Sequence, residues 1–318
     1  MKKQLLLSAL LLLAFNLVRA NVFTVSNNLA HPTAYTDIQS AVNAASAGDS
    51  VYVIGSLTQY AGVGISKQIN LFGPGFYPQK NNVLTATVNG ITLNAGSDGT
   101  LISGMVITSG VYFASNASIS NITVERNNLF GSGFGFGGND IVTNFKVINN
   151  VMVNGGTFLS PSNTVFNNFL VENNVIANEN SPMINGGFTS NTTLFKNNVI
   201  MTNVSGGNGT YPLTGQVEQV TFTNNIFVGW LISNGTNGVQ FCTFDHNLAY
   251  LESGTYSSDP FTGGGSNNTS LSNIYNENPD FVNAPLSNPL YNSDFHLLAG
   301  SPSLTAASDG GATGRLWR

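Results

Sequence analysis

The stretch Val171-Glu172-Asn173-Asn174-Val175-Ile176 sets the architecture of this 318-residue chain, because a version of it returns five more times. The shared pattern is an apolar residue, two further residues and an asparagine, usually followed by an apolar pair. The copies end at Asn127, Asn150, Asn174, Asn198, Asn225 and Asn247. Successive asparagines are 23, 24, 24, 27 and 22 residues apart, which is the length of one short supersecondary unit. A unit this small cannot bury its own apolar face and must stack on its neighbours.

The composition of the repeat favours strands over helices. Apolar residues alternate within a unit, as in Phe169 and Val171 or Val220 and Phe222, and this is the period of a β-strand. Asn, Gly, Ser and Thr fill the gaps between these runs, and such residues suit turns. We therefore predict an all-β fold, a single-stranded parallel β-helix whose rungs stack at roughly 4.8 Å. The repeated asparagines would then lie over one another as a ladder of hydrogen-bonded side-chain amides.

Residues 1–20 have the layout of a secretory signal peptide. Two lysines precede an apolar run from Leu5 to Phe15, and Val18-Arg19-Ala20 resembles a cleavage site. The run is too short for a comfortable membrane span, so no transmembrane segment is expected. We expect a mature chain that begins near Asn21 and is secreted or held at the cell surface.

The charge of the chain limits the partners it can bind, and its cysteine content limits how the fold can be stabilised. The formal net charge is −5, and three of the ten Lys and Arg residues lie within residues 1–20, so the mature chain would be more acidic still. Nucleic acid is a poor partner for such a surface. The single cysteine, Cys242, cannot form an internal disulfide, so stacked core must hold the fold. It stands at an apolar position shortly before Phe244, which predicts a buried structural thiol rather than a nucleophile.

The region that precedes the repeats is typical of the start of a solenoid. Phe23-Thr24-Val25 predicts a short strand, and residues 35–47 predict an amphipathic helix with its apolar residues on one face. Thr36 and Gln39 stand at capping-box spacing, and Gly48 is predicted to end the helix. This N-terminal helix would cap the open apolar end of the stack.

Both ends of the chain resemble a known family. Residues 34–54, with Tyr35-Thr36-Asp37-Ile38-Gln39-Ser40-Ala41 and Gly48-Asp49-Ser50-Val51-Tyr52-Val53, resemble the opening of secreted bacterial right-handed β-helix proteins of the pectin-lyase-like superfamily. Asn278-Pro279-Asp280-Phe281-Val282-Asn283 is similar to the closing segment of such proteins from polysaccharide-degrading bacteria. The resemblance implies a right-handed β-helix, with residues 21–274 as the capped solenoid and residues 275–318 as its closing segment. It implies fold rather than activity, since the fold hosts lyases, hydrolases, esterases and proteins with no known reaction.

Few residues on this surface could carry catalysis. The resemblance implies that a lyase would use a Lys or Arg base and acids that hold calcium, and a hydrolase needs two or three neighbouring carboxylates. Outside the signal and the tail, the available cations are Lys67, Lys80, Arg126, Lys146 and Lys196. Aligned on the ladder, Glu172 and Lys196 are neighbours on adjacent rungs, most simply as a surface ion pair. Lys196, Glu172 and Arg126 are therefore the catalytic candidates, and no stacked acid pair appears.

The histidines offer two arrangements that could act as chemical sites. Asp245 and His246 form a possible acid/base couple, but adjacent residues of a strand point to opposite faces. His31 and His296 lie in the terminal segments, and no metal-ligand spacing joins them to a third residue. No metal site is predicted, and calcium would be the cofactor only if the protein is a lyase.

Glycine-rich stretches predict loops on the solenoid surface. They are residues 131–138 and 206–209, with a further loop over residues 254–272 before the closing segment. Phe134 and Phe136 in the first stretch are candidate sugar-stacking rings, although phenylalanines at such positions more often pack onto the solenoid.

The remaining surface is a long, weakly charged wall of Asn, Thr, Ser and Gly. Amides and hydroxyls both donate and accept hydrogen bonds, which suits hydroxyl-rich polymers. We expect an exported, monomeric protein that binds extracellular polysaccharide or a cell-surface glycan, or that serves as a surface structural or adhesin-like module, without catalysis. The alternative is a polysaccharide lyase that cleaves uronic-acid polymers by β-elimination. A third class, recognition of a flat solid such as ice or crystalline glycan, lacks the strict Thr-x-Thr ladder that would favour it.

Overall fold

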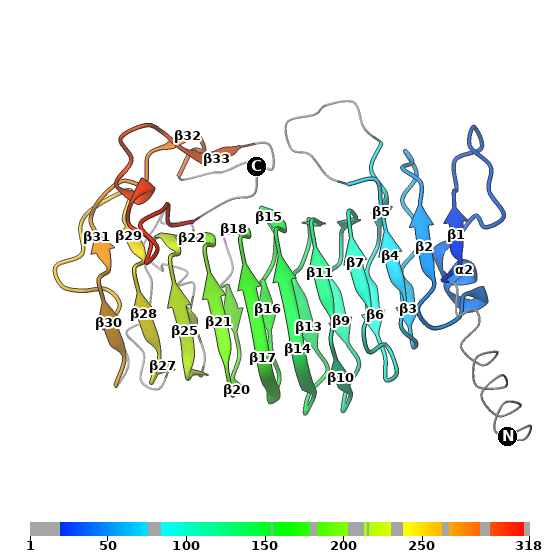
Figure 1. Cartoon of the computed structure of the whole chain (residues 1–318), viewed down its shortest axis with the longest axis horizontal. Coiled ribbons are helices and arrows are strands. Elements are labelled where there is room, and N and C mark those ends of the chain that lie inside the picture. The colour runs from blue at the N-terminus through cyan, green and yellow to red at the C-terminus, as the bar shows by residue number, and fades with distance from the viewer. Residues whose placement is uncertain are drawn as a thin grey trace, which may run out of the picture.

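The protein is a parallel β-helix, an elongated stack of short strands (Figure 1). The structure, a computed structural model, describes residues 20–75, 84–153, 155–178, 183–202, 213–214, 216–229, 238–262, 267–286 and 293–314. Strands from successive turns of the chain pair in parallel and form three sheets, here called A, B and C. A two-stranded antiparallel sheet, D, belongs to the closing segment. The predicted all-β parallel β-helix is thus confirmed.

The strands of the 15-stranded sheet A follow the chain along the stack. Its main path is β1 (Val22–Val25), β2 (Ser50–Val53), β4 (Asn70–Phe72), β7 (Leu101–Ser103), β11 (Thr123–Glu125), β14 (Ile141–Ile148), β17 (Thr164–Glu172), β21 (Thr193–Lys196), β25 (Val220–Thr223), β28 (Thr243–Asp245) and β30 (Thr269–Leu271). Beside this path lie β10 (Ser118–Ser120), β20 (Phe188–Ser190), β24 (Val217–Glu218) and β27 (Val239–Gln240).

The other sheets follow the same order. Sheet B comprises β5 (Thr87–Val88), β8 (Val106–Ile107), β12 (Asn128–Leu129), β15 (Val151–Val153), β18 (Val175–Asn178), β22 (Val199–Thr202), β26 (Ile226–Val228), β29 (Leu248–Tyr250) and β31 (Ile274–Tyr275). Sheet C comprises β3 (Val63–Ile65), β6 (Ile91–Leu93), β9 (Val111–Phe113), β13 (Phe134–Phe136), β16 (Leu159–Ser160), β19 (Ile184–Asn185) and β23 (Leu213–Thr214). Sheet D pairs β32 (Phe281–Asn283) with β33 (Asp294–Leu297).

Sheet A shows how the alternating sequence builds the core. One inward position recurs in register on successive rungs, and its side chain is 0% exposed in each of Val51, Leu71, Ile102, Val124, Val147, Val171, Phe195, Phe222 and Phe244. Within the core, the rings of Phe145 and Phe169 stack with centroids 4.9 Å apart and planes inclined by 7°. That separation equals the strand spacing, so each ring lies over its counterpart one rung away.

The predicted asparagine stacking is seen in the turn between sheets A and B. Each side-chain amide donates to the Oδ1 of the next asparagine, from Asn127 to Asn247, at Nδ2···Oδ1 distances of 2.9–3.1 Å. The same Oδ1 accepts the backbone N–H of the preceding asparagine at 2.8–3.0 Å. The row continues to Asn273, which the sequence pattern does not include because the apolar inward position is Ser270 there. These seven residues are called the ladder below.

The predicted N-terminal helix caps the first rungs but is shorter than expected. The helix α2 spans Ile38–Ala44 and packs against β1, β2 and β3. Its N-cap is Asp37, whose carboxylate accepts the N–H of Ser40 at 2.8 Å, so the predicted cap at Thr36 is wrong by one residue. The helix also ends before Gly48, because Ala45 is already extended. The ammonium of Lys67 bonds to the Ala45 carbonyl at 2.7 Å and satisfies that end.

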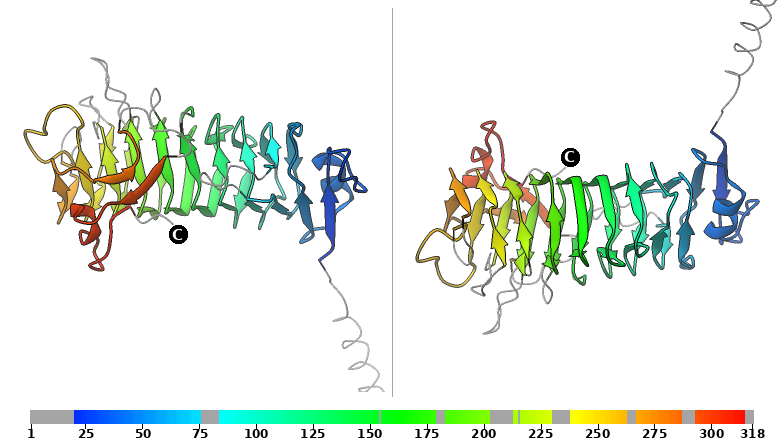
Figure 2. Two further views of the ribbon diagram at one scale, coloured as in Figure 1. Left: turned by 90° about the horizontal axis from the view of Figure 1, so that it is seen from above. Right: turned by 90° about the horizontal axis from the view of Figure 1, so that it is seen from below.

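The closing segment covers the outer face of sheet B. Sheet D and a 3₁₀ turn, η1 (Pro302–Leu304), lie across the later turns of the stack, as the view from above in Figure 2 shows. Phe281 and Phe295 pack together and join Val199 and Ile226 in a second buried apolar cluster. All four residues of β22 are buried, because this sheet has core on one face and the closing segment on the other.

One of the predicted glycine-rich loops contains a strand. Residues 131–138 include β13 of sheet C, flanked by residues without regular structure. Glycine is required at Gly133 and Gly135 because the neighbouring rungs approach closely: a Cβ would lie 2.1 Å from the carbonyl oxygen of Phe158 at the first and 2.6 Å from the Tyr112 ring at the second. Residues 206–209 and Lys80 lie outside the described residues. The loop over 254–272 ends in β30, and its Phe261 packs on Phe244 with ring centroids 5.4 Å apart.

Candidate functional site

Sheet A bends along a line of residues with positive φ. The bend residues are Asn121, Asn144, Asn168, Thr192, Gln219 and Phe241, with φ of 58°, 54°, 60°, 146°, 57° and 54°, and this set is called the bend row below. They lie on successive rungs in parallel register. The first three are linked by side-chain bonds, from Asn144 to Asn121 at 2.9 Å and from Asn168 to Asn144 at 2.7 Å. Asparagine tolerates this backbone better than most residues, which explains its recurrence.

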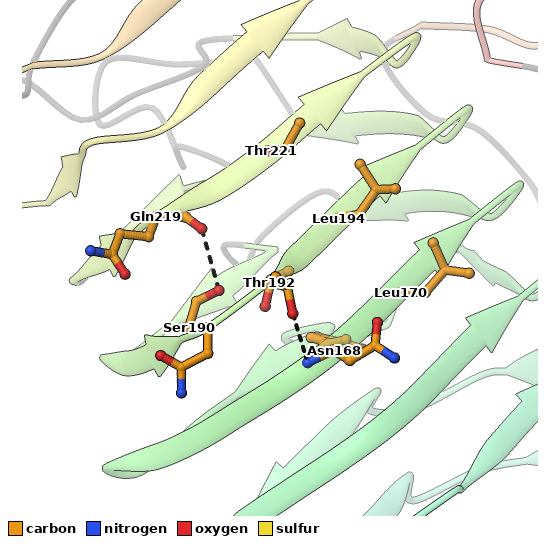
Figure 3. Close-up of a pocket in the computed structure, with 10 residues that line it drawn as sticks. Asn168, Leu170, Ser190, Thr192, Leu194, Gln219 and Thr221 are labelled. Atoms are coloured by element: carbon orange, nitrogen blue, oxygen red, sulfur yellow. Dashed lines mark hydrogen bonds between the residues drawn. The ribbon is translucent and has the colours of Figure 1, made fainter.

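A shallow groove of about 750 Å³ opens on the outer face of sheet A at this bend (Figure 3). It crosses β17, β21 and β25, and residues on both sides of the bend contribute to it. The lining residues are Asn168, Phe169, Leu170, Ser190, Asn191, Thr192, Thr193, Leu194, Gln219 and Thr221. Two hydrogen bonds hold the walls: Thr192 Oγ1 accepts the N–H of Asn168 at 3.1 Å, and Ser190 Oγ donates to the carbonyl of Gln219 at 3.3 Å.

The groove is chemically uniform. Its lining consists of amides, hydroxyls and apolar side chains and carries no charge. Leu170 and Leu194 are partly exposed on adjacent rungs and provide an apolar strip, while exposed Asn168 and Asn191 provide donors and acceptors beside it. Such a surface can hydrogen-bond to hydroxyl groups and contact the apolar faces of ring compounds.

Two residues of the bend row are unsuited to their backbone. Thr192 is β-branched with φ of 146°, and Phe241 is bulky with φ of 54°. Such conformations cost free energy and persist where surrounding structure or function maintains them. Phe241 lies one rung beyond Gln219, whose N–H bonds to the carbonyl of Gln240 at 3.2 Å, and its side chain is 53% exposed. An exposed aromatic ring therefore continues the line of the groove.

The catalytic candidates Glu172 and Lys196 lie beside the groove. They are paired in register on β17 and β21, and Lys196 Nζ lies 3.9 Å from Glu172 Oε1. Both side chains are partly exposed, so this is an ordinary surface ion pair worth at most about 1 kcal/mol. Lys196 lies two residues after the groove residue Leu194 on the same outer face. The pair was foreseen from the repeat alignment.

Two other cations, Arg126 and Lys146, differ in how near they lie to the groove. Arg126 is exposed with φ of 54° in the turn before its ladder asparagine, and the described register places it three rungs before Lys196. Lys146 is exposed on the outer face of β14 and lies one rung before Leu170. Lys146 and Lys196 therefore lie next to residues of the groove without lining it, whereas Arg126 lies farther away.

Asp245 and His246 contact each other, contrary to the argument from strand alternation. His246 Nδ1 lies 2.7 Å from Asp245 Oδ1, and both side chains are partly exposed. His246 is not in the strand: β28 ends at Asp245, and the φ of 53° at His246 turns its side chain back. The exclusion based on opposite faces was therefore wrong, although the couple lies outside the residues that line the groove.

The candidate sugar-stacking rings are buried. Phe134 is 1% exposed and Phe136 is 8% exposed. Phe134 packs edge-on against Phe145 at 5.3 Å, and Phe136 packs edge-on against Phe166 at 5.2 Å. Neither ring has a free face for a sugar, so the alternative of packing onto the solenoid holds for both and they are not sugar-stacking residues. Sequence alternation around Phe241 is interrupted by the bend, which is why this exposed ring was missed.

Histidines and acids are dispersed over the described ranges. His31 is exposed between β1 and α2, and His296 Nδ1 bonds to Asp294 Oδ1 at 2.5 Å in β33 of the closing segment. No group of three or more His, Cys, Asp or Glu within the described part of the chain is arranged to hold a metal ion. Among the same residues, no helix has the length and apolar character needed to cross a bilayer.

Comparison with known proteins gives no family. The sequence matches no model of a protein family, and a search of curated proteins finds no significant match.

Proposed function

We propose that the protein is exported after removal of residues 1–20 and binds an extracellular polysaccharide along the outer face of sheet A, without catalysing its cleavage. The observation that carries this proposal is the uncharged groove at the bend, with Leu170 and Leu194 as its apolar strip and amides and hydroxyls around them. Phe241 extends the site as a stacking ring. The resemblance of both chain ends to the pectin-lyase-like superfamily is part of the same proposal.

The geometry of the stack supports an extended ligand. The bend row runs over six rungs from Asn121 to Phe241. At the usual strand spacing this row is roughly 24 Å long. A polymer with a repeating hydroxyl pattern can contact such a regular row at several points, whereas a small ligand would fill only the groove at its centre.

The direct test is retention of the purified chain, beginning at Asn21, on insoluble polysaccharides and in gels that contain soluble ones. Neutral and uronic-acid polymers should be compared, because the uncharged lining predicts preference for a neutral polymer. Retention that is lost when Leu194 is replaced by Asp, with unchanged circular dichroism, supports the proposal. Binding that survives Leu194→Asp, or no retention on any polymer, contradicts it.

The second candidate function is a polysaccharide lyase, favoured by the position of Lys196 beside the groove. In β-elimination a base removes the proton next to the uronate carboxylate and the C4 oxygen leaves, which produces an unsaturated sugar that absorbs in the ultraviolet. The assay should use alginate, pectate and glycosaminoglycans, with and without calcium. Rising absorbance that disappears in Lys196→Ala would replace the binding proposal by the lyase, and no rise supports binding alone.

A further inference from the structure

The first described strand begins beside a buried carboxylate. Asp49, which precedes β2, is only 3% exposed. Its Oδ1 accepts the N–H of Asn21 at 2.7 Å, and its Oδ2 accepts the N–H of Ser46 at 2.7 Å. Asn21 itself precedes β1, and its carbonyl accepts the N–H of Ser50 at 2.8 Å. Both oxygens of Asp49 thus hold backbone where the solenoid starts.

The position of Asn21 coincides with the expected cleavage site. Hydrolysis of the bond between Ala20 and Asn21 would turn the bonded amide nitrogen of Asn21 into a free α-ammonium group. Ala20 and Asn21 are both exposed, so water can reach the two additional N–H groups. The bond to Asp49 would then join an ammonium to a carboxylate instead of an amide to a carboxylate, and charge-assisted bonds are roughly twice as strong.

We propose that Asp49 is the docking site for the α-ammonium group that removal of residues 1–20 creates at Asn21, so that processing itself strengthens the N-terminal cap. The reaction is hydrolysis of one peptide bond: water supplies the hydroxyl to the Ala20 carbonyl carbon and one proton to the Asn21 nitrogen. The acidic proton of the new Ala20 carboxyl group then passes to the amine, which leaves a carboxylate on Ala20 and an ammonium on Asn21. The new ammonium lies within 2.7 Å of Asp49 Oδ1, if the nitrogen keeps its place.

The surroundings of Asp49 favour this pairing. The N–H groups of Asn21 and Ser46 hold the pKa of the Asp49 carboxyl below its usual range, and Lys67 contributes a smaller attraction. Lys67 itself bonds to the carbonyls of Asn43 and Ala45. On α2, the nearby acid is the cap Asp37, which bonds to Ser40, and β1 carries no titratable side chain. The α-ammonium therefore has one buried carboxylate as its partner.

Docking of the α-ammonium group on Asp49 predicts how the stability of the protein changes with pH. An ammonium beside a carboxylate has its pKa raised above the value of about 7.7–8.0 for a free α-amino group. Its contribution to stability is fully present below the unfolded value near 8 and is lost as the pH rises through the higher folded value.

The experiment compares two full-length mature chains, one beginning at Asn21 and one retaining Ala20, each released from a fusion by a protease that leaves no extra residue. Labelling of the α-amino group by acetic anhydride over a range of pH, quantified on the N-terminal peptide by mass spectrometry, gives its pKa. We expect a pKa raised by about one unit or more in the chain beginning at Asn21 and an ordinary value when Ala20 is retained. The first chain should also have the higher Tm at pH 7, with a difference that disappears above pH 10.

Three outcomes overturn the proposal. The first is an ordinary pKa in the chain that begins at Asn21, and the second is equal Tm for the two chains. The third is an N-terminus other than Asn21 in the naturally exported protein, as measured by its intact mass. Asp49→Asn should bring the pKa at Asn21 back to the ordinary range, and the comparison of the two chains remains decisive even if that variant folds poorly.

Discussion

The two asparagines of each Asn-Asn pair differ in the backbone angle φ and therefore in role. In the pair Asn173-Asn174, the first residue has φ of 56° and makes the turn, and the second is 0% exposed and bonds to the next rung. The sequence sufficed to place six of the seven ladder asparagines, because these recur at the rung period three residues after the inward apolar residue, whereas Asn273 follows Ser270. It could not assign the turn residues, because the same amide side chain suits both roles.

Local sequence patterns did not settle where the side chains of His246, Phe134 and Phe136 lie. His246 was assumed to obey the alternation of a strand, but its φ of 53° places it in a turn against Asp245. Phe134 and Phe136 were considered for exposure because glycines surround them, yet these glycines are imposed by the close approach of neighbouring rungs. At His246 the local backbone decides where the side chain lies, and at Phe134 and Phe136 the contacts with neighbouring rungs decide it.

The environment of Cys242 predicts an unreactive thiol. Burial raises the pKa of Cys242 to about 11, and the side chain is 1% exposed. The thiolate is the nucleophile, so the native protein should react negligibly with Ellman's reagent at pH 8. We expect one thiol per chain to react in urea and essentially none without it. Rapid reaction of the folded protein would show that this rung opens readily.

The ladder is a buried polar network in which each side chain hydrogen-bonds to groups on both neighbouring rungs. Asn174 donates to the carbonyl of Val147 at 2.9 Å and accepts the N–H of Asn150 at 2.8 Å. Replacing Asn174 by Ala leaves both groups buried without partners. At about 1–3 kcal/mol for each of the two orphaned groups, we expect Asn174→Ala to lower the free energy of unfolding by about 2–6 kcal/mol. The urea midpoint followed by circular dichroism measures it.

The matched control for the ladder is Asn144→Gly in the bend row. Asn144 also bonds to asparagines on both neighbouring rungs, but those bonds are exposed to water. Glycine keeps the left-handed backbone that the bend requires. This variant should lose no more than about 1 kcal/mol. Equal losses in the two variants would mean that burial does not distinguish the ladder from the exposed row.

The N-terminal cap predicts a pH dependence at low pH. The pKa of Asp49 is lowered in the folded state, chiefly by the N–H of Asn21, so its contribution to stability is present above the unfolded value of about 3.9 and is lost as the pH falls through the folded value. Asp49→Asn should therefore lower the Tm at pH 7, and the gap to the wild type should close below pH 4. A gap that stays constant from pH 7 to pH 2 would show that the carboxylate charge is irrelevant there.

In the whole molecule, the closing segment buries the outer face of sheet B. Successive residues of β22 and β26 are buried because core covers one face and the closing segment covers the other. Ser308 and Asn224 bond to each other, and Gly314 donates its N–H to the Asn224 carbonyl at 2.7 Å. The continuous apolar runs were visible in the sequence, but nothing local indicated which segment would cover the outer face, since Asn224 and Ser308 are 84 residues apart.

Truncation tests this covering role. Removal of residues 301–318 should uncover apolar side chains of sheet B, among them Val199 and Ile226, which lie close to Gly314. We expect the truncated chain to bind more of the dye ANS and to associate, whereas the intact chain elutes as a monomer with little dye bound. Light scattering coupled to size exclusion distinguishes the two. A truncated chain that remains monomeric without extra dye would show that the outer face is protected by other means.

The elongated shape and the bend row together support the proposal that polysaccharide binds on the outer face of sheet A. Its most direct test is calorimetric titration with an oligosaccharide from a polymer that retains the protein. The titration is run on the wild type and on the variants Phe241→Asn and Phe130→Asn. Phe241 and Phe130 are 53% and 54% exposed, but Phe130 does not line the groove or belong to the bend row. Asparagine suits the φ of 54° at position 241, so Phe241→Asn should fold with unchanged or higher Tm.

We expect Phe241→Asn to raise the Kd for the oligosaccharide by about tenfold or more, the equivalent of one lost stacking contact, and Phe130→Asn to leave the Kd unchanged. Equal affinities for all three proteins, or equal loss in both variants, would contradict the proposal.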